Sequence, residues 1–367
     1  MKVVIVVKPA EYSKQMNRSQ SIEFAAEMLK KLITAVPIVL SVEVTASGKE
    51  NKRYGFDLKI CFNTKDCISI AVEVNNNGEI KYVRKAIETL KGSLKKGEYG
   101  VVAAPFISKD AVLLCEQNGI SFFDFSGNCL LAFSNIYIRT EGKRNKFTEK
   151  KENKNLLVRS SVKSGTVLRE MLNEPEKQWQ VQELAKATKT SIGMVSNIKK
   201  FLLAKEWCVE ENGRFALRNI AGLLKVWSEE YQKSKEMAYE FYSIDSVAEI
   251  EKQMFELYNK SGVVCCLASF SAAVRYKPTV TYNKAYAYVA QRDFDEAVSF
   301  MNLKPVETGG NVELIIPYDE CVLIHSKKKK DAFITSPTQT VLDLFSKKAR
   351  GEEAALEIIE KEFGTYA

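Results

Sequence analysis

The sequence predicts a multi-domain α/β protein in which a helical module separates two α/β domains. The chain has 367 residues, too many for one ordinary core. Strand and helix patterns alternate over residues 1–142 and again over residues 237–367, as in α/β domains. Between them a basic polar stretch, residues 143–155, precedes a helix-rich segment, residues 156–236. We interpret the stretch as an exposed linker and the segment as a separate domain.

The composition is that of a soluble globular protein with a moderate excess of positive charge. Hydrophobic residues make up 46% of the chain and charged residues 27%. The net charge of +8 favours a polyanionic partner. No apolar run approaches the ~18 residues of a membrane span, and the run at residues 3–7 suits a strand better than a signal peptide. We therefore expect a cytoplasmic protein that does not enter a membrane.

The cysteines and the histidine exclude several kinds of site. Eight cysteines are scattered, mostly inside apolar runs, and none has the spacing of a zinc site. This usage predicts buried thiols in a reducing compartment. Because His325 is the only histidine, imidazole-based metal sites and Ser-His-Asp catalysis are almost excluded.

The first α/β domain is expected to be a sheet with helices packed on it. Helical spacing of apolar residues predicts helices at 22–33, 80–94 and 111–117. Strands are predicted at 3–7, 38–44, 57–62, 67–74, 99–104, 120–125, 130–133 and 136–138, and 57–62 pairs with 67–74 as a hairpin. The polar cluster at residues 124–128 predicts a tight turn, with a ligand role for Asp124 and Asn128 as the alternative.

Two carboxylates in this domain suggest a metal site. Asp57 lies on one predicted strand and Glu73 ends the next, before a helix and a further strand. This order resembles the PD-(D/E)xK nucleases, in which such residues hold a divalent metal and a lysine after the glutamate helps to activate water. Here Asn75 occupies the lysine position and carries no charge, although Lys81 on the helix could compensate. We expect a degenerate site; ordinary polar strand ends are the alternative.

Residues 178–217 contain two short helices, a tight turn and a hairpin in that order. The first helix, 181–187, has an apolar face, and the turn 188–190 is polar. The second helix opens at Ser191, and its apolar residues share one side: Ile192, Val195, Ile198, Phe201 and Leu202. Asn212-Gly213 then joins two alternating strands, which is the strongest local hairpin signal. The order predicts a winged helix-turn-helix; a helical hairpin inside a larger domain is the alternative.

The polar side chains of this segment are of the types that contact DNA. Ser191 should cap the second helix and present its first N–H groups to a phosphate. Ser196 and Asn197 are candidates for base edges. The remaining DNA-binding candidates, for the phosphate backbone and the turn, are Lys189, Thr190, Lys199, Lys200 and Arg214, the last at the tip of the wing. Residues 143–155 could also contact phosphates.

The last domain is predicted to be α/β. Two further helices, expected at 162–172 and 219–231, flank the winged helix within residues 156–236. In the last domain, helices are expected at 247–258, 271–274, 294–301, 337–348 and 352–363. Strands are expected at 263–267, 285–289, 312–316 and 321–324. The pattern resembles nucleotidyltransferase folds, but residues 268–271 lack the Gly-Ser turn and no Asp-x-Asp follows. Asp293 and Asp295 are explained as helix caps and the four lysines 327–330 as a solvated loop. We expect a non-catalytic domain.

Several stretches together resemble the AbiEi antitoxins of type IV toxin–antitoxin systems. They are GVVAAPFIS and GISFFDFSGN (100–108 and 119–128), the winged-helix segment from VLREMLNEPEKQ to EWCV, ASFSAA (268–273) and the tail ITSPTQTVLDLFSKKARGEEAALEIIEKEF (334–363). The resemblance implies a bacterial, cytoplasmic DNA-binding protein that represses its own operon through an inverted repeat. It also implies a nucleotidyltransferase-like toxin as a genetic partner, counteracted without a stable complex. Simple members begin with the winged helix, whereas about 150 residues precede it here.

The sequence therefore predicts a transcriptional regulator that binds double-stranded DNA as a homodimer and needs no cofactor. The alternative is a metal-dependent endonuclease of the PD-(D/E)xK class, targeted to DNA by its winged helix. In that case Mg²⁺ would be bound by Asp57 and Glu73.

Overall fold

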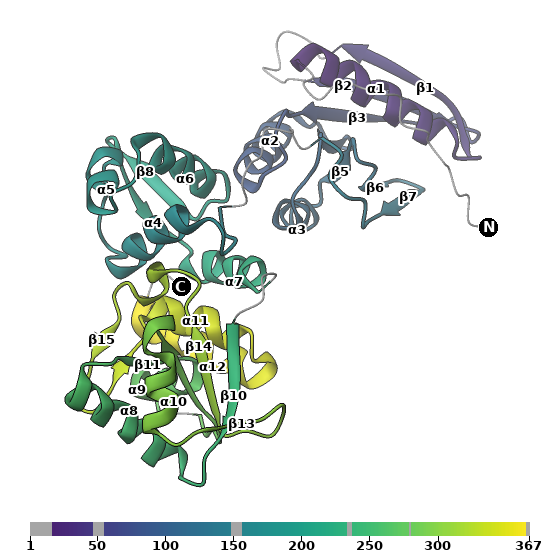
Figure 1. Cartoon of the computed structure of the whole chain (residues 1–367). Helices are drawn as coiled ribbons and strands as arrows, with labels where there is room; N and C mark the ends of the chain where they lie inside the picture. Colours follow the sequence, from purple (N-terminus) through teal and green to yellow (C-terminus); the bar gives the residue numbers. More distant parts are fainter. Residues whose placement is uncertain (1–16, 47–54, 148–155, 233–236, 279, 365–367) are drawn as a thin grey trace. The chain divides into compact units, whose positions relative to one another are not determined.

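The computed structural model describes residues 17–46, 55–147, 156–232, 237–278 and 280–364. These form two compact units, Met1–Asn153 and Lys154–Ala367, which we describe separately (Figure 1). The strand expected at residues 3–7 and the part of the basic linker at 148–155 lie outside the described residues. Most other expected elements are present within one to four residues of their expected ends.

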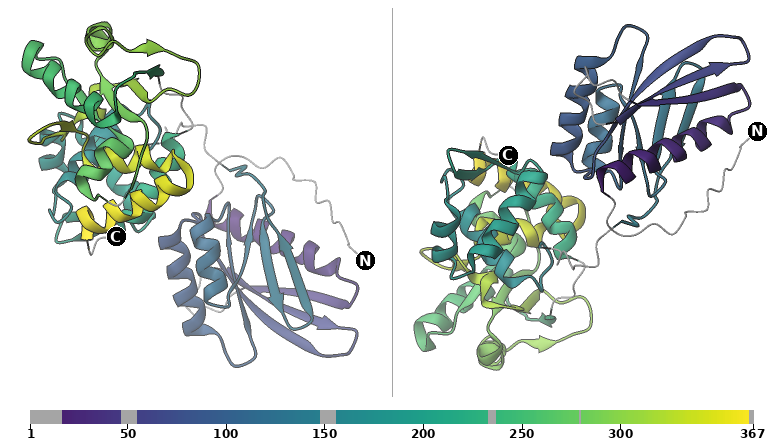
Figure 2. Two further views of the ribbon diagram at one scale, coloured as in Figure 1. Left: turned by 90° about the horizontal axis from the view of Figure 1, so that it is seen from below. Right: turned by 90° about the horizontal axis from the view of Figure 1, so that it is seen from above.

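The first unit is a three-layer α/β/α sandwich. Among the described residues, its sheet has seven strands in chain order: β1 Val39–Ala46, β2 Gly55–Phe62, β3 Cys67–Val74, β4 Tyr99–Ala104, β5 Ser121–Asp124, β6 Cys129–Phe133 and β7 Ile136–Thr140. β3, β4 and β5 are parallel and the other neighbours are antiparallel. Helix α1 (Arg18–Thr34) covers one face, and α2 (Ile80–Ser93) and α3 (Lys109–Gln117) cover the other (Figure 2).

Alternation of side chains explains why both faces of this sheet are covered. Val101 and Ala103 of β4 lie in the hydrophobic cluster under α1, whereas Val102 and Ala104 lie in the cluster under α2 and α3. Successive strand residues point to opposite faces, so an apolar strand such as β4 needs cover on both sides. Helix α1 begins at Asn17, whose side chain accepts from the backbone of Gln20 in a capping box.

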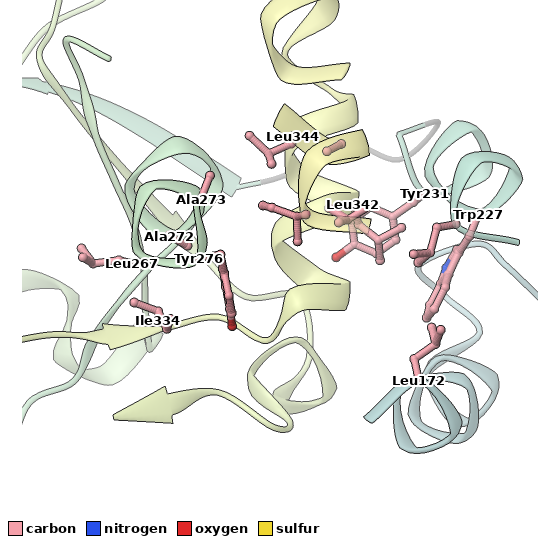
Figure 3. Close-up of a cluster of buried hydrophobic side chains, with 14 of the residues drawn as sticks. Leu172, Trp227, Tyr231, Leu267, Ala272, Ala273, Tyr276, Ile334, Leu342 and Leu344 are labelled. Carbon is pink, nitrogen blue, oxygen red and sulfur yellow. The ribbon is translucent and has the colours of Figure 1, made fainter. Parts of the chain in front are cut away.

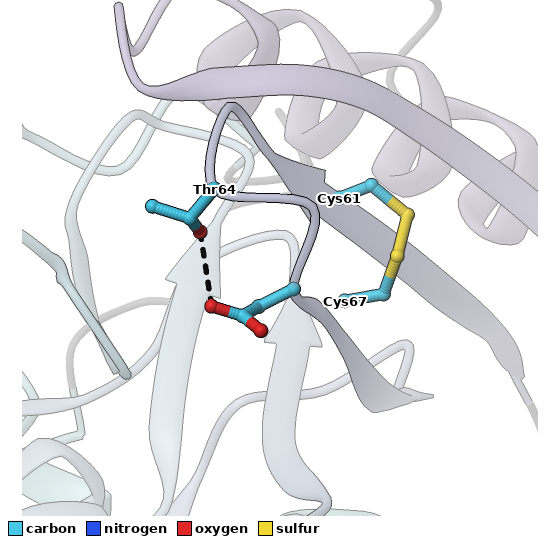
Figure 4. The surroundings of a disulfide bond; sticks show 4 residues. Cys61, Thr64 and Cys67 are labelled. Carbon is cyan, nitrogen blue, oxygen red and sulfur yellow. Dashed lines mark hydrogen bonds between the residues drawn. A yellow bond between two sulfur atoms is a disulfide. The ribbon is translucent and has the colours of Figure 1, made fainter.

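Two cysteines of the first unit are not free thiols. Cys61 and Cys67 face each other across the β2–β3 hairpin and form a disulfide, next to the Thr64–Asp66 hydrogen bond in the connecting turn (Figure 4). The expectation of buried, reduced thiols is therefore wrong at these positions. The cause is geometric, since paired positions of an antiparallel hairpin bring two Cβ atoms within disulfide range. The other six cysteines are buried and are not part of a disulfide.

The second unit begins with helices and a hairpin and continues as a sheet with helices. The first part contains α4 Val162–Asn173, α5 Val181–Ala187, α6 Ile192–Ala204, the hairpin β8 Cys208–Glu211 with β9 Arg214–Leu217, and α7 Ile220–Tyr231. The second part contains β10 Met237–Tyr242, α8 Val247–Ser261, β11 Cys265–Leu267, α9 Ser269–Tyr276, β12 Ala285–Val289, α10 Phe294–Phe300, β13 Lys304–Pro305, β14 Val312–Ile316, β15 Lys327–Lys328, β16 Phe333–Ile334, α11 Pro337–Phe345 and α12 Lys348–Phe363. The sheet order is β13-β10-β14-β12-β11-β16-β15.

This second sheet differs from the expectation in several places, including the short strands β13 and β16, which were not expected. Residues 321–324 were expected as a strand but belong to a 3₁₀ turn, Glu320–Leu323, which Asp319 caps. The four lysines 327–330 were expected in a loop, yet the first two form the edge strand β15. Strand β10 was not expected, although it lies between β13 and β14. Short apolar segments carry little periodicity, so strand pairing over long sequence distances decides them.

Helix α11 joins the two parts of the second unit. Its Leu342 and Leu344 lie in one hydrophobic cluster with side chains from both parts, namely Leu172, Trp227, Tyr231, Leu267, Ala272, Ala273, Tyr276 and Ile334 (Figure 3). Helices α7 and α9 both pack on α11. The helices before residue 232 and the C-terminal sheet therefore share one continuous core.

A buried polar network crosses the same junction. Arg169 of α4 donates from its Nη2 to Oε1 of Gln339 in α11, at 2.6 Å. The amide nitrogen of Gln339 donates to Oδ1 of Asp343, at 2.7 Å, and to the hydroxyl of Tyr231 in α7, at 3.1 Å. The hydroxyl of Tyr288 in β12 donates to the same Asp343 oxygen, at 2.9 Å. Since these groups are buried, the network fixes α4 and α7 against α11.

Candidate nucleic-acid interface

Helices α5 and α6 are joined by a turn whose hydroxyls are used internally. The Thr188 hydroxyl donates to the Leu184 carbonyl at 2.7 Å and lies 2.8 Å from the hydroxyl of Thr190. Lys189 adopts a positive φ of 50° between them. Thr190, a DNA-binding candidate in the sequence, therefore closes the turn, whereas the side chain of Lys189 is exposed.

Helix α6 begins at Ser191 as expected. The Ser191 hydroxyl accepts from the backbone N–H of Met194 at 3.2 Å and so caps the helix. Val195, Ile198 and Leu202 are buried against the rest of the unit. The helix therefore has one face fixed in the core.

The first residue of α6 departs from the expectation. Ile192 was assigned to the buried face, but its side chain is 55% exposed. At 3.6 residues per turn, Ile192 lies roughly 90° from the mean direction of the buried residues. Met194, two residues later, is partly buried against the core.

The opposite face of α6 is open. Gly193, Asn197 and Lys200 are exposed and Ser196 is half-buried. A Cβ built on Gly193 would have no heavy atom within 4 Å. These four residues, which we call the α6 open face, point away from the buried face because they are one, four, five and eight residues after Ile192. The helix thus presents short polar groups, one cation and bare backbone along one side.

Lys199 does not belong to the α6 open face. Its Nζ lies 2.6 Å from Oε1 of Glu210 in β8 and 5.5 Å from the ring centre of Phe215 in β9. Its side chain is 16% exposed. The charge of Lys199 is therefore balanced inside the unit, and this lysine attaches α6 to the hairpin.

Arg214 also has a partner inside the unit. Its Nη1 donates to the Gln178 carbonyl at 2.9 Å and lies 3.6 Å from Oε2 of Glu183 in α5. The hairpin turn itself has the expected geometry, with positive φ at Asn212 and Gly213. Trp179 bonds to Phe215 through both backbone groups and forms an isolated antiparallel bridge beside the hairpin. The wing is less basic than the sequence suggested.

Two exposed cations near the predicted interface were missed in the sequence. Lys186 lies in the last turn of α5 and Arg218 follows β9. Together with Lys189 and Lys200, they have no ion-pair partner among the residues that the structure describes. The sequence could have indicated both residues, since each lies within two residues of the end of a helix or strand, where the long side chains of lysine and arginine reach solvent.

The two candidate carboxylates of the first unit lie on neighbouring strands. Asp57 pairs with Ala71 and Glu73 with Gly55, so the two carboxylates share a face of the sheet but are offset by two residue pairs. Asp57 lines a cavity of about 280 Å³, and the lining side chains described do not include Glu73, which is 3% exposed. Over the described ranges, no group of three or more His, Cys, Asp or Glu side chains could hold a metal ion.

The residues next to Glu73 do not fit a magnesium-dependent nuclease either. The Asn75 amide donates to the carbonyl of Tyr82 at 3.0 Å and so holds the start of α2. Lys81 lies exposed in the first turn of that helix. Neither side chain is placed to activate a water between two carboxylates, so we derive no step through a metal.

Asp124 and Asn128 close the turn between β5 and β6. Both carboxylate oxygens of Asp124 accept from Asn128, one from its backbone N–H at 2.8 Å and one from its side-chain amide at 2.7 Å. Asn128 in turn bonds to both backbone groups of Lys143. Burial raises the pKa of Asp124, and the bonds from Asn128 oppose that shift. These contacts give the pair a structural role.

The C-terminal part has a serine in a strained backbone conformation within residues 268–271, the stretch that lacks the Gly-Ser turn of nucleotidyltransferases. Ser269, the first residue of α9, has φ of 47° and is fully buried. Its hydroxyl has no hydrogen-bond partner among the described residues. A nucleotidyltransferase would need paired aspartates near β12. Here Lys284 precedes that strand and forms an ion pair with Glu240, and Tyr286 lies on the strand.

Other charged groups of this part are paired. Asp293 was expected to cap α10, but its side chain makes no capping bond; it lies 3.4 Å from Nε of Arg292. Lys327 lies 3.9 Å from Glu362, and Nζ of Lys328 lies 4.6 Å from the ring centre of Tyr258. The lysine run is therefore partly packed rather than simply solvated.

Comparison with known families identifies the C-terminal part. Residues 216–363 match a family described as transcriptional regulator, AbiEi antitoxin, type IV toxin–antitoxin system. We call these matched residues the AbiEi segment. This AbiEi segment runs from the last strand of the hairpin through α7 and the C-terminal sheet to the end of α12. The resemblance found in the tail sequence is confirmed. No curated protein matches the chain.

Two solved structures show limited likeness to the chain. A repair endonuclease from Pyrococcus abyssi is 13% identical, with 32% of this chain and 49% of that chain covered and a TM-score of 0.20. EndoMS in its apo form is 19% identical, with 32% and 48% covered and a TM-score of 0.20. The chain spans about half the length of these structures. Within the described ranges, no helix is long and apolar enough to cross a bilayer.

Proposed function

We propose that the chain is a DNA-binding transcriptional regulator, and that α4 to β9 form a winged helix-turn-helix. The observation that carries this proposal is the α6 open face. One side of α6 is fixed in the core, and the other presents Asn197, Ser196, Lys200 and the bare backbone of Gly193. A helix with these groups on its free side suits the major groove, where base edges and phosphates lie within its reach.

The proposed contacts differ in kind. Asn197 and Ser196 bond to base edges, and the first N–H groups of α6 at Ser191 face a phosphate. Lys189 and Lys200 contact phosphates. Lys199 and Arg214, also candidates from the sequence, position the hairpin against α6 and α5, because their charges are engaged there.

The AbiEi segment gives the regulator its proposed biological setting. We propose an antitoxin that binds an inverted repeat as a homodimer and represses its own operon. Its genetic partner would be a nucleotidyltransferase-like toxin, counteracted without a stable complex. The C-terminal sheet would then be a nucleotidyltransferase-like but non-catalytic domain, and the regulator would work without a metal or other cofactor in the cytoplasm.

Two substitutions separate the proposed base contact from the proposed phosphate contact. The binding of Asn197→Ala and Lys200→Ala is compared on a duplex selected by the wild-type protein and on random duplexes, by fluorescence anisotropy over a salt series. Lys200→Ala should weaken binding to both duplexes and lower the salt slope by about 0.9. Asn197→Ala should lose about 1–3 kcal/mol of discrimination with little change on random duplexes.

The same measurement can contradict the proposal. If the wild-type protein ignores duplexes at low ionic strength, the DNA-binding function is wrong. If both variants change specific and random binding alike, the assignment of roles on the α6 open face is wrong.

A further inference from the structure

An aliphatic side chain stands at the start of the α6 open face. Ile192 is 55% exposed in the first turn of the helix, although Val195, three residues later, is fully buried. It is followed by Gly193, where a Cβ would meet nothing within 4 Å. The surface there consists of one isoleucine side chain and exposed backbone.

The position of Ile192 matters more than its exposure. Single exposed aliphatic residues are common and need no explanation by themselves. In helix-turn-helix proteins, however, the N-terminal residues of the second helix contact base edges. The groove offers only one strongly apolar group to such a residue, the 5-methyl of thymine. Asn197 follows five residues later on the α6 open face, with the hydrogen-bonding groups that recognise a neighbouring base.

Gly193 makes the approach of a base edge feasible. Because it lacks a side chain, nothing beside Ile192 holds the helix away from the groove floor. Ser191, which caps the helix, directly precedes Ile192. The first N–H groups of the helix can therefore face a phosphate while Ile192 contacts a base.

We propose that Ile192 determines sequence specificity by packing against the 5-methyl group of a thymine. This inference rests on the proposed DNA-binding function and goes beyond it, because it names one apolar base contact. The contact would add to affinity only where a thymine occupies that position. A uracil there keeps every hydrogen-bonding group of the base and removes only the methyl.

The test uses the full-length protein and synthetic duplexes. A preferred duplex is first selected from a random pool by the wild-type protein, and each thymine is then replaced by uracil in turn. Binding is measured for the wild type, Ile192→Ala and Leu356→Ala. Leu356 of α12 is a matched control, since it is a similarly exposed aliphatic side chain (52%) outside the interface. Circular dichroism checks that each variant folds.

We expect one thymine per half-site to stand out. Replacing it with uracil should weaken the wild type and Leu356→Ala roughly fourfold, the effect of losing about one buried methyl. Ile192→Ala should bind the thymine and uracil duplexes equally, and its own selection should lose the preference at that position.

Two outcomes would overturn the inference, and they are distinguishable. If a duplex is selected but Ile192→Ala keeps the full uracil effect at every thymine, Ile192 contacts no methyl and only this inference fails. If no duplex is enriched by the wild type at low salt, the DNA-binding function fails with it.

Discussion

Ser269 has a backbone conformation that serine rarely adopts. Its φ of 47° lies in the left-handed region, where a Cβ is unfavourable, and its buried hydroxyl has no partner among the described residues. Both features are unfavourable for folding. Glycine would avoid both, because it accepts positive φ and has no hydroxyl.

Ser269→Gly should therefore stabilise the second unit. The gain from relieved strain and from the lost unpaired hydroxyl should exceed the extra entropy of an unfolded glycine by about 1 kcal/mol. Ser269→Ala removes the hydroxyl but keeps the strained Cβ, so it should gain less. Urea unfolding followed by tryptophan fluorescence measures the order. A Ser269→Gly variant that unfolds earlier than the wild type would show that the serine is held by an interaction we have not identified.

The chemistry of single residues was only partly predictable from the sequence. Ser191 was correctly expected as a cap, because capping depends on neighbours three residues away. Lys199 was expected on DNA, yet it binds Glu210, eleven residues later and on another element. Ile192 was expected in the core but is exposed. The helical spacing of apolar residues alone does not show which edge of the apolar face is covered by the rest of the protein. Local partners were visible in the sequence and distant ones were not.

At the scale of elements, the hairpin limits the positive charge that α6 can offer. Glu210 neutralises Lys199, and Arg214 is drawn toward Glu183. The turn at Asn212 and Gly213 was predictable, because both residues take the positive φ that a two-residue hairpin needs. The docking of the hairpin on α6 was not, since it depends on side chains outside the local pattern.

Glu210→Gln should strengthen binding to duplex DNA. The change releases the charge of Lys199 and removes an acidic group from the proposed interface, so random duplexes should bind more tightly and the salt slope should rise by about 0.9. Glu211→Gln is the matched control, because it removes the same charge from the adjacent residue without a described contact to Lys199. Anisotropy titrations over a salt series measure both variants. Equal slopes for the two would mean that Lys199 stays bound to the hairpin.

At the scale of the whole molecule, the second unit combines two parts that the sequence separates. The boundary expected at residue 236 follows the change from helices to a sheet, and it is visible in the pattern. The shared core and the network of Arg169, Gln339 and Asp343 are not visible, since Arg169 lies 170 positions before Gln339. Gly165 contributes to this junction, because a Cβ there would lie 2.9 Å from Nη1 of Arg169. The proposed DNA-binding helices are thus fixed to the AbiEi segment.

This coupling can be measured because each part has its own probe. All three tryptophans, Trp179, Trp207 and Trp227, lie before residue 232, whereas Cys265 and Cys266 lie in the C-terminal sheet. Burial raises the pKa of both thiols to about 12, so they should resist alkylation until the sheet unfolds. In the wild type, fluorescence and alkylation of these two cysteines, followed by mass spectrometry, should report one urea transition.

Breaking the network should separate the two transitions. Gln339→Leu leaves the Arg169 guanidinium buried without its acceptor and should lower the free energy of unfolding by roughly 1.5–3 kcal/mol, with fluorescence changing at less urea than alkylation. Adding Arg169→Met removes the stranded charge, so the double variant should recover part of the loss and bring the transitions together again. If Gln339→Leu keeps one shared transition at the wild-type midpoint, the apolar core of α11 alone holds the two parts together and the network has no such role.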